Sequence, residues 1–136
     1  MSEPVWLLES AVLIVHEVTL SIHGGGVGIR DQGLLESALA RPRNLYEYGE
    51  PGIFELAAAY TGGVVQNHPF IDGNKRTGFL AGAAFLELNG YRFVASETEA
   101  TQIILALASG QLSEQQLADW MEKSSRRPEM TSSKSE

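Results

Sequence analysis

The residues of this chain with the clearest chemical potential lie together between His68 and Arg76, in the sequence HPFIDGNKR. This stretch combines a base, a carboxylate, a glycine, an amide and two adjacent cations, and an apolar run begins soon after it, at Phe79. Free N–H groups at the start of a helix, together with the positive end of the helix dipole, favour a bound anion. A loop of this composition that leads into a helix therefore predicts a phosphate-binding site.

The polar residues of the stretch have distinct predicted roles. Gly73 lets the backbone approach a phosphate closely and adopt a positive φ. Arg76 can bind phosphate through two N–H groups, whereas Lys75 acts as a point charge. Asp72 is a candidate Mg²⁺ ligand because Mg²⁺ prefers carboxylate and phosphate oxygens. His68 is a candidate general base on a target hydroxyl, because histidine exchanges protons near neutral pH.

The same residues also have purely structural interpretations. Asp72 could cap the following helix, since aspartate is a favoured N-cap, and Asn74 could be a turn residue. Lys75 and Arg76 could be a solvated pair, but cations at a helix start oppose the dipole. Unfavourable placement without local compensation is typical of a binding site, so we favour phosphate contact for both. Phe70 is expected to be a core anchor that fixes the loop.

The rest of the chain has the pattern of a mostly helical domain, because no segment alternates apolar and polar residues with the period of a strand. Pro4 suits the first turn of a helix, and Ser96 and Ser113 each begin a sequence typical of a capping box. Gly24–Gly28 is interpreted as a turn, and residues 42–52 as a surface loop or hairpin. Helices are expected over about residues 4–22, 31–41, 53–66, 75–89, 96–110 and 113–124.

Length and composition describe an ordinary globular domain. The chain has 136 residues, of which 43% are hydrophobic and 20% charged, and it has no cysteine, which excludes disulfides and thiolate metal sites. No apolar run approaches the roughly 20 residues that cross a bilayer, and the N-terminus lacks the basic region of a secretory signal. A cytoplasmic location without membrane association is expected. Residues 1–124 are expected to form the domain, and residues 125–136 a disordered tail.

The charge distribution limits the kind of ligand. The net charge is −7, so a broad nucleic-acid surface and direct DNA binding are not expected. Positive charge occurs in small clusters such as Lys75 with Arg76. An acidic protein with a local cationic pocket suits a small phosphorylated ligand better than a polyanion.

The stretch from His68 closely resembles the signature of the Fic/Doc superfamily, His-x-Phe-x-Asp/Glu-Gly-Asn-x-Arg-x-x-Arg. Lys75 stands where Fic nucleotidyl transferases usually carry glycine, and Phe79 stands where they carry a second arginine. These two departures resemble the Doc (death-on-curing) toxin branch. The order of elements is similar to that branch up to about residue 124. The matching residues are His68, Phe70, Asp72, Gly73, Asn74 and Arg76.

The resemblance implies a compact, single-domain, all-α fold of about six helices with a short flap loop or hairpin. It implies a toxin of a type II toxin–antitoxin pair that transfers the γ-phosphate of ATP to a serine or threonine of a target protein. The implied target belongs to the translation machinery, such as elongation factor Tu, and its modification arrests growth. Mg²⁺ would bind at Asp72 and ATP at the loop, with His68 as base. The implied ATP-binding residues are Gly73, Asn74, Lys75 and Arg76.

The resemblance also assigns residues to partners. The family's target-binding flap corresponds to the 42–52 region, which offers Arg43, Leu45, Tyr46 and Tyr48, and such flaps pair by backbone with an extended substrate segment. A variable loop is the alternative. No glutamate in the chain is followed by glycine or asparagine, so the inhibitory motif of many Fic proteins is missing. An antitoxin that inhibits in trans, through a segment that folds on binding, is therefore expected.

Two other functions remain open at this point. The nearest is a Fic-type nucleotidyl transferase that moves AMP or a related nucleotide to a protein hydroxyl, with the same loop on the α-phosphate. Phe79 argues against it, because it removes a phosphate contact that those enzymes use. The other is a non-catalytic binding protein that keeps the fold and an anion pocket. The presence of His68 and Asp72 argues against that alternative.

Overall fold

The structure, a computed structural model, describes residues 3–127, and most of them are helical. The elements are α1 (Glu9–His23), α2 (Gln32–Tyr48), α3 (Ile53–Asn67), α4 (Asn74–Leu88), β1 (Arg92–Phe93), α5 (Glu97–Ala108), α6 (Glu114–Lys123) and β2 (Ser125–Arg126). The all-α fold and the number of helices expected from the sequence are therefore confirmed for this part of the chain. No helix among residues 3–127 is both long and apolar enough to cross a membrane.

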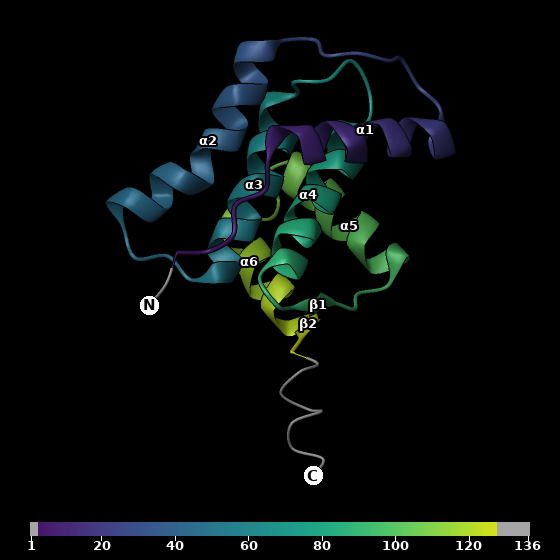
Figure 1. The fold of residues 1–136 in the computed structure, drawn as a ribbon. Coiled ribbons are helices and arrows are strands. Elements are labelled where there is room, and N and C mark those ends of the chain that lie inside the picture. The colour runs from purple at the N-terminus through teal and green to yellow at the C-terminus, as the bar shows by residue number, and fades with distance from the viewer. Residues whose placement is uncertain (1–2, 128–136) are drawn as a thin grey trace.

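Helices α3 and α4 form the centre of the domain (Figure 1). α3 packs against α2, α4 and α6, and α1 lies across one end of α4 while α5 lies beside α4. The residues from Leu56 to Val65 are all buried, so α3 has no solvent face over most of its length. A helix that is apolar on all sides is typical of a core position.

The central helices approach closely because glycines and small residues line their contacts. A Cβ on Gly82 would meet the Thr61 hydroxyl and would lie 2.9 Å from the Ala57 carbonyl oxygen. The Thr61 hydroxyl donates to the Gly78 carbonyl at 2.8 Å, which joins α3 to α4 inside the core. On the other side of α3, a Cβ on Gly63 would lie 2.9 Å from the carbonyl oxygen of Ala38 in α2.

The prediction that α2 stops before Pro42 is wrong, since the helix continues to Tyr48 with Pro42 buried inside it. A proline within a helix removes the hydrogen bond to the carbonyl four residues earlier, here that of Ala38. The same carbonyl faces Gly63 across the α2–α3 contact. Packing along α3 therefore outweighs the local penalty of the proline. The loop or hairpin predicted at residues 42–52 is reduced to the short connection between Tyr48 and Ile53.

The N-terminal residues are extended rather than helical, so α1 begins at Glu9 and not near Pro4. Hydrogen bonds to the core fix this segment. The Leu7 N–H donates to the buried Tyr60 hydroxyl at 3.0 Å, and the Asn89 side chain accepts from the Val5 N–H at 2.8 Å and donates to its carbonyl at 3.0 Å. Burial raises the pKa of the Tyr60 phenol, although the hydrogen bond from Leu7 lowers it, so the group is neutral at physiological pH.

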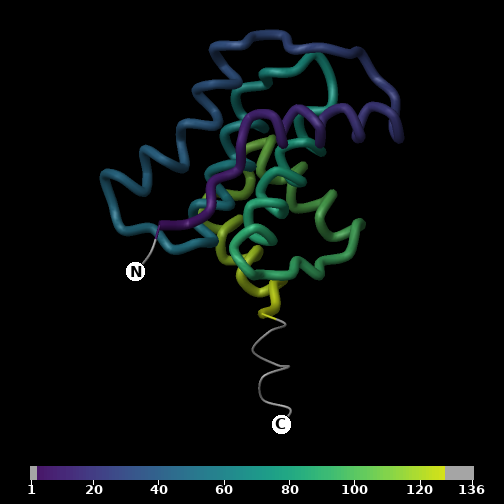
Figure 2. The backbone as a smooth tube through the Cα atoms, viewed as in Figure 1, coloured from purple at the N-terminus to yellow at the C-terminus, as the bar shows by residue number. Residues whose placement is uncertain are grey.

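The C-terminal residues are ordered further than expected. Ser125–Arg126 pairs antiparallel with Arg92–Phe93, and Figure 2 shows the two strands at the end of the domain opposite α1. The predicted disorder is therefore wrong for residues 125–127, and residues 128–136 lie outside the described part. The Ser113 capping box is confirmed, and the Ser96 hydroxyl accepts from the Glu99 N–H at 3.1 Å as one half of such a box.

The close contact of α2 with α3 gives a test of the fold. We expect Gly63→Ala to destabilise the protein by about 1–3 kcal/mol, because the added methyl forces backbone shifts at the Ala38 carbonyl. Gly33→Ala, at an exposed helical site in α2, is the matched control and should be neutral or stabilising by up to about 1 kcal/mol. Urea unfolding monitored by circular dichroism measures both. Equal stability of the two variants would contradict the packing described here.

Candidate active site

The stretch from His68 to Gly73 is the loop that joins the two central helices. His68 ends α3 in the left-handed conformation, with φ 53° and ψ 54°, and is the only non-glycine residue with positive φ among residues 3–127. Gly73, with φ 82°, begins α4. Non-glycine residues in the left-handed region are strained, and they cluster at functional sites. The loop therefore places an exposed histidine between two rigid helices.

The side chain of Asn74 closes this loop from within. It is 3% exposed, and its Oδ1 accepts from the Phe70 N–H at 2.9 Å while its Nδ2 donates to the Phe70 carbonyl at 2.9 Å. The same Nδ2 lies 3.2 Å from Nδ1 of His68. The prediction that the Asn74 amide contacts phosphate is therefore corrected, because the side chain is buried and its polar atoms are already used. Phe70 is fully buried, as expected for a core anchor.

The glycine-rich segment after α1 lies along the outside of the loop (Figure 1). Ile71 N–H donates to the Gly28 carbonyl at 3.1 Å, and the Arg30 N–H donates to the Pro69 carbonyl at 2.7 Å. The Arg30 guanidinium donates to the carbonyls of Asn67 at 3.0 Å and His68 at 2.7 Å. A cation that binds the last carbonyls of a helix is favourably placed. Arg30 therefore stabilises the end of α3 from which His68 projects.

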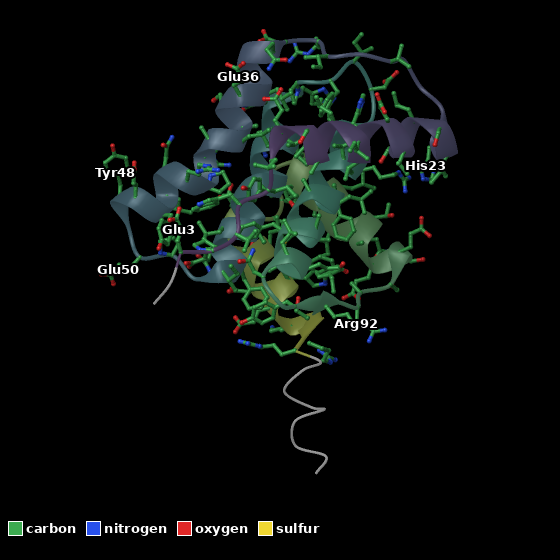
Figure 3. The ribbon with its side chains drawn as sticks, viewed as in Figure 1. Glu3, His23, Glu36, Tyr48, Glu50 and Arg92 are labelled. Atoms are coloured by element: carbon green, nitrogen blue, oxygen red, sulfur yellow. The ribbon has the colours of Figure 1, made fainter. Side chains whose placement is uncertain are left out.

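The predicted flap residues are not at the loop. Arg43 lies 5.0 Å from the ring centroid of Trp6, and Tyr46 packs edge-on against the same ring at 5.5 Å. Both therefore hold the N-terminal segment on the domain. Tyr48 is exposed at the end of α2 far from the loop (Figure 3), and Leu45 lies in the same last turns of the helix. The segment beside the loop is residues 24–31, whereas residues 42–48 are helical. Target binding by residues 42–52 stays a prediction.

Asp72 does not cap α4. Its side chain turns toward the glycine-rich segment, where Oδ2 accepts from the Gly26 N–H at 2.6 Å. The residue is exposed, and residues 3–127 contain no cluster of three or more metal-ligating side chains. A lone exposed carboxylate fits Mg²⁺ that takes its remaining ligands from phosphate and water, as is usual for Mg²⁺ with nucleotides.

The start of α4 is open to an anion. Its N-cap is Gly73, which has no side chain to accept a hydrogen bond, and the first bond of the helix runs from the Thr77 N–H to the Gly73 carbonyl at 2.9 Å. No capping side chain therefore takes the N–H groups of Asn74, Lys75 and Arg76. Lys75 and Arg76 are exposed there, and Nη1 of Arg76 lies 3.6 Å from Oε2 of Glu97. The structure thus brings the predicted loop residues together, with the Asn74 side chain inside the loop rather than at its surface.

A groove of about 510 Å³ continues from these cations between α4 and α5. Its lining includes the charged residues Lys75, Arg76 and Glu97, whereas most of its wall is apolar. Figure 3 shows His23, which also lines it, at the end of α1. Such a combination suits a ligand with an aromatic or aliphatic body and an anionic end. The apolar wall comprises Phe79, Leu80, Phe93, Ala95, Ala100, Ile104 and Leu105.

Two residues of the site escaped the sequence analysis. Arg30 carried no signal, because nothing local indicates that its guanidinium binds another helix. The other residue is His16, which is buried against Phe70 and bonds the main chain of Asp72. A signal existed for His16, since it shares one face of α1 with Val12 and Thr19 at the spacing of a core stripe. The large majority of buried polar side chains have a hydrogen-bond partner.

Comparison with known proteins agrees with this geometry. The Fic/DOC family model matches residues 6–86. A protein named Toxin Doc, from Mycolicibacterium smegmatis, is 41% identical over 75 residues, which are 53% of this chain and 57% of that protein. A protein named Protein kinase doc, from Escherichia phage P1, is 29% identical over 113 residues, which are 82% of this chain and 89% of that protein.

The family model covers more than half of the 136 residues, and the chain belongs to the Fic/DOC family. Both relatives carry the Doc name, which places the chain in the Doc branch, as Lys75 and Phe79 predict. The alignment with the Mycolicibacterium protein spans little more than half of that protein's length.

The bonds of Asn74 give a test of the loop. Asn74→Asp keeps an acceptor for the Phe70 N–H but sets a carboxylate oxygen against the Phe70 carbonyl. We expect Asn74→Asp to lower the free energy of unfolding by about 1–3 kcal/mol. Asn44→Asp, the same change at an exposed position in α2, should stay within about 0.5 kcal/mol of the wild type. Chemical denaturation measures both, and a fully stable Asn74→Asp protein would show that the loop does not depend on this amide.

Proposed function

We propose that the chain is a Doc-type toxin that transfers the γ-phosphate of ATP to a serine or threonine hydroxyl of a target protein. The observation that carries the proposal is the position of His68 beside the open N-terminus of α4, with Lys75 and Arg76 on its first turn. The name of the phage P1 relative, a protein kinase, supports the same reaction. A protein of the translation machinery, such as an elongation factor, is the proposed target.

The phosphates of ATP would bind at the start of α4. Three uncapped N–H groups and the helix dipole favour the anion, while Lys75 and Arg76 neutralise the charge that moves during transfer. On binding, Arg76 would leave its ion pair with Glu97 and bind a phosphate oxygen instead. The loss of this ion pair costs little free energy, because an exposed ion pair contributes at most about 1 kcal/mol. The nucleoside would then extend into the apolar groove between α4 and α5.

His68 would act as the general base. The target hydroxyl loses its proton to the imidazole, its oxygen forms a bond to the γ-phosphorus, and the bond from that phosphorus to the β–γ bridging oxygen breaks to release ADP. In the structure the Asn74 amide donates toward Nδ1, so the proton of the neutral ring lies on Nε2. For Nε2 to accept a proton, the exposed ring must exchange tautomers and leave Asn74. At 3.2 Å that hydrogen bond is long, which favours the exchange.

Asp72 would hold Mg²⁺, which would supply positive charge beside the phosphates. The carboxylate is exposed, and one of its oxygens already accepts from Gly26. That hydrogen bond would fix the direction of the carboxylate before the metal binds.

Phe79 favours phosphate transfer over nucleotide transfer. Its ring packs against Phe93 at 5.4 Å and against Trp120 at 6.3 Å between ring centroids, so it belongs to an aromatic cluster beside the groove. A side chain of this kind offers no charge to a second phosphate. In this proposal Lys75 and Arg76, on the first turn of α4, supply the charge to the terminal part of a polyphosphate.

Control by a partner completes the proposal. The sequence has no inhibitory Ser/Thr-x-x-x-Glu-Gly/Asn motif, so an active transferase that arrests growth would need inhibition in trans. The Toxin Doc name of one relative supports an antitoxin as that partner.

Labelled ATP tests the reaction directly. The purified chain is incubated with Mg²⁺, a lysate and ATP labelled at the α- or the γ-phosphate. We expect protein-bound label from the γ-position only, and a rate about 10²–10⁴-fold lower for His68→Ala, the range that general-base catalysis contributes. An unchanged melting temperature of the variant controls for folding. Label from the α-position would establish nucleotidyl transfer, and no label from either would favour a binding protein.

Removal of the metal and of its ligand tests Asp72. Chelation should abolish transfer, and added Mg²⁺ should restore it. Asp72→Asn keeps an acceptor for the Gly26 N–H but removes the charge, so it should raise the Mg²⁺ concentration for half-maximal rate at least tenfold, since even outer-shell partners of a metal contribute about 10–100-fold. Asp119→Asn, on α6, is the matched control. An unchanged Mg²⁺ requirement in Asp72→Asn would exclude this carboxylate as the ligand.

A further inference from the structure

A second histidine, outside the motif, contacts the loop from α1. His16 is 4% exposed, and its ring stacks on that of Phe70 with a centroid distance of 3.8 Å and an interplanar angle of 13°. Its Nε2 lies 2.8 Å from the main-chain oxygen of Asp72. A Cβ built on Gly73 would lie 3.6 Å from Cδ2 of the same ring. One side chain of α1 thus contacts two residues of the loop, Phe70 and Asp72, and lies beside a third, Gly73.

The hydrogen bond has a defined direction. A carbonyl oxygen only accepts, so Nε2 of His16 carries the hydrogen and donates it to Asp72. The other anchor of Asp72 is its carboxylate, which accepts from the Gly26 N–H at 2.6 Å. The main chain and the side chain of Asp72 are therefore held by different segments, α1 and the glycine-rich segment. Together the two bonds fix the direction in which the carboxylate points.

The stack on Phe70 extends the contact toward His68. The Phe70 ring lies against His16, while its main-chain N–H and carbonyl bond the side chain of Asn74. The Asn74 amide in turn reaches Nδ1 of His68. A displacement of the His16 ring would therefore change the positions of both the Asp72 carboxylate and the His68 imidazole.

We propose that His16 is a positioning residue for the reaction, which holds the Asp72 carboxylate in a fixed relation to His68 without touching the substrate. The effect on turnover rests on the proposed function, whereas the effect on the loop does not. Residues that orient a metal ligand without binding the metal themselves typically contribute about 10–100-fold to metal affinity or reaction rate.

The alternative is that His16 only fills space. Under that interpretation an apolar side chain of similar volume would serve equally well, since volume-conserving changes in a core are tolerated. Under the positioning interpretation a donor is required, so His16→Gln, which can present an N–H to the Asp72 carbonyl, should function and His16→Leu should not. Thr19→Val is the matched control. Thr19 is buried on the same face of α1, and its hydroxyl has no partner within the described residues, so the change alters packing beside Gly73 without removing a hydrogen bond.

The first measurement is amide hydrogen exchange at Gly26, read by NMR on the full chain without nucleotide. In His16→Leu we expect exchange about tenfold faster or more, because the Asp72 carboxylate loses its fixed direction. His16→Gln and Thr19→Val should exchange as the wild type does. Unchanged exchange in His16→Leu, or equal acceleration in His16→Gln, would overturn the proposal. If His16→Leu does not fold, loss of protection in a folded His16→Gln protein would overturn it, and retained protection would support it.

The second measurement is the kinetics of phosphate transfer. His16→Leu should lower kcat about 10–100-fold with less than about threefold change in the KM for ATP, because the cations and N–H groups of α4 remain. His16→Gln should restore most of the rate. A change confined to KM would overturn the positioning role. If the wild type transfers no label, the proposed function fails, while the exchange at Gly26 still decides whether His16 positions the loop.

Discussion

The hydrogen bonds between the Asn74 side chain and the main chain of Phe70 are the interaction on which the candidate site depends. They close the loop between α3 and α4 inside the core, where an unpaired amide would cost about 1–3 kcal/mol. The N-cap of α4 is Gly73, so no capping side chain takes the N–H groups of that turn. The Asn74 amide also reaches His68, so the anion site and the base are held by one residue.

The nature of the site could be predicted from the sequence because its chemistry is contiguous. The residues from His68 to Arg76 need only a loop and a helix start to come together, and local rules describe both. The supporting contacts could not be predicted in this way. His16 bonds a carbonyl 56 residues away, and Arg30 binds carbonyls that lie 37 and 38 residues ahead. The pattern along α1 indicates that residue 16 is buried, but nothing in it identifies the partner.

The errors in the predicted fold have a common cause. Local rules ended α2 at Pro42 and left residues 125–127 disordered, and tertiary contacts reversed both outcomes. The turn of α2 around Pro42 is held by its contact with α3, whereas Ser125–Arg126 is held by two residues of β1. The contact with α3 makes residues 42–48 part of a helix rather than of a surface loop. Helix starts with serine caps, by contrast, depend on local bonds and were predicted correctly.

The contact between Gly63 and Ala38 constrains how this protein can diverge over evolutionary time. A side chain at residue 63 is accommodated only if α2 moves away from α3. Such a movement would carry with it the segment before α2, including Arg30, and so would loosen the end of α3 at His68. Enlargement at residue 63 should therefore be inherited only together with changes in α2 that restore this distance. Sequence change in α2 is therefore coupled to sequence change in α3, although neither Ala38 nor Gly63 belongs to the site.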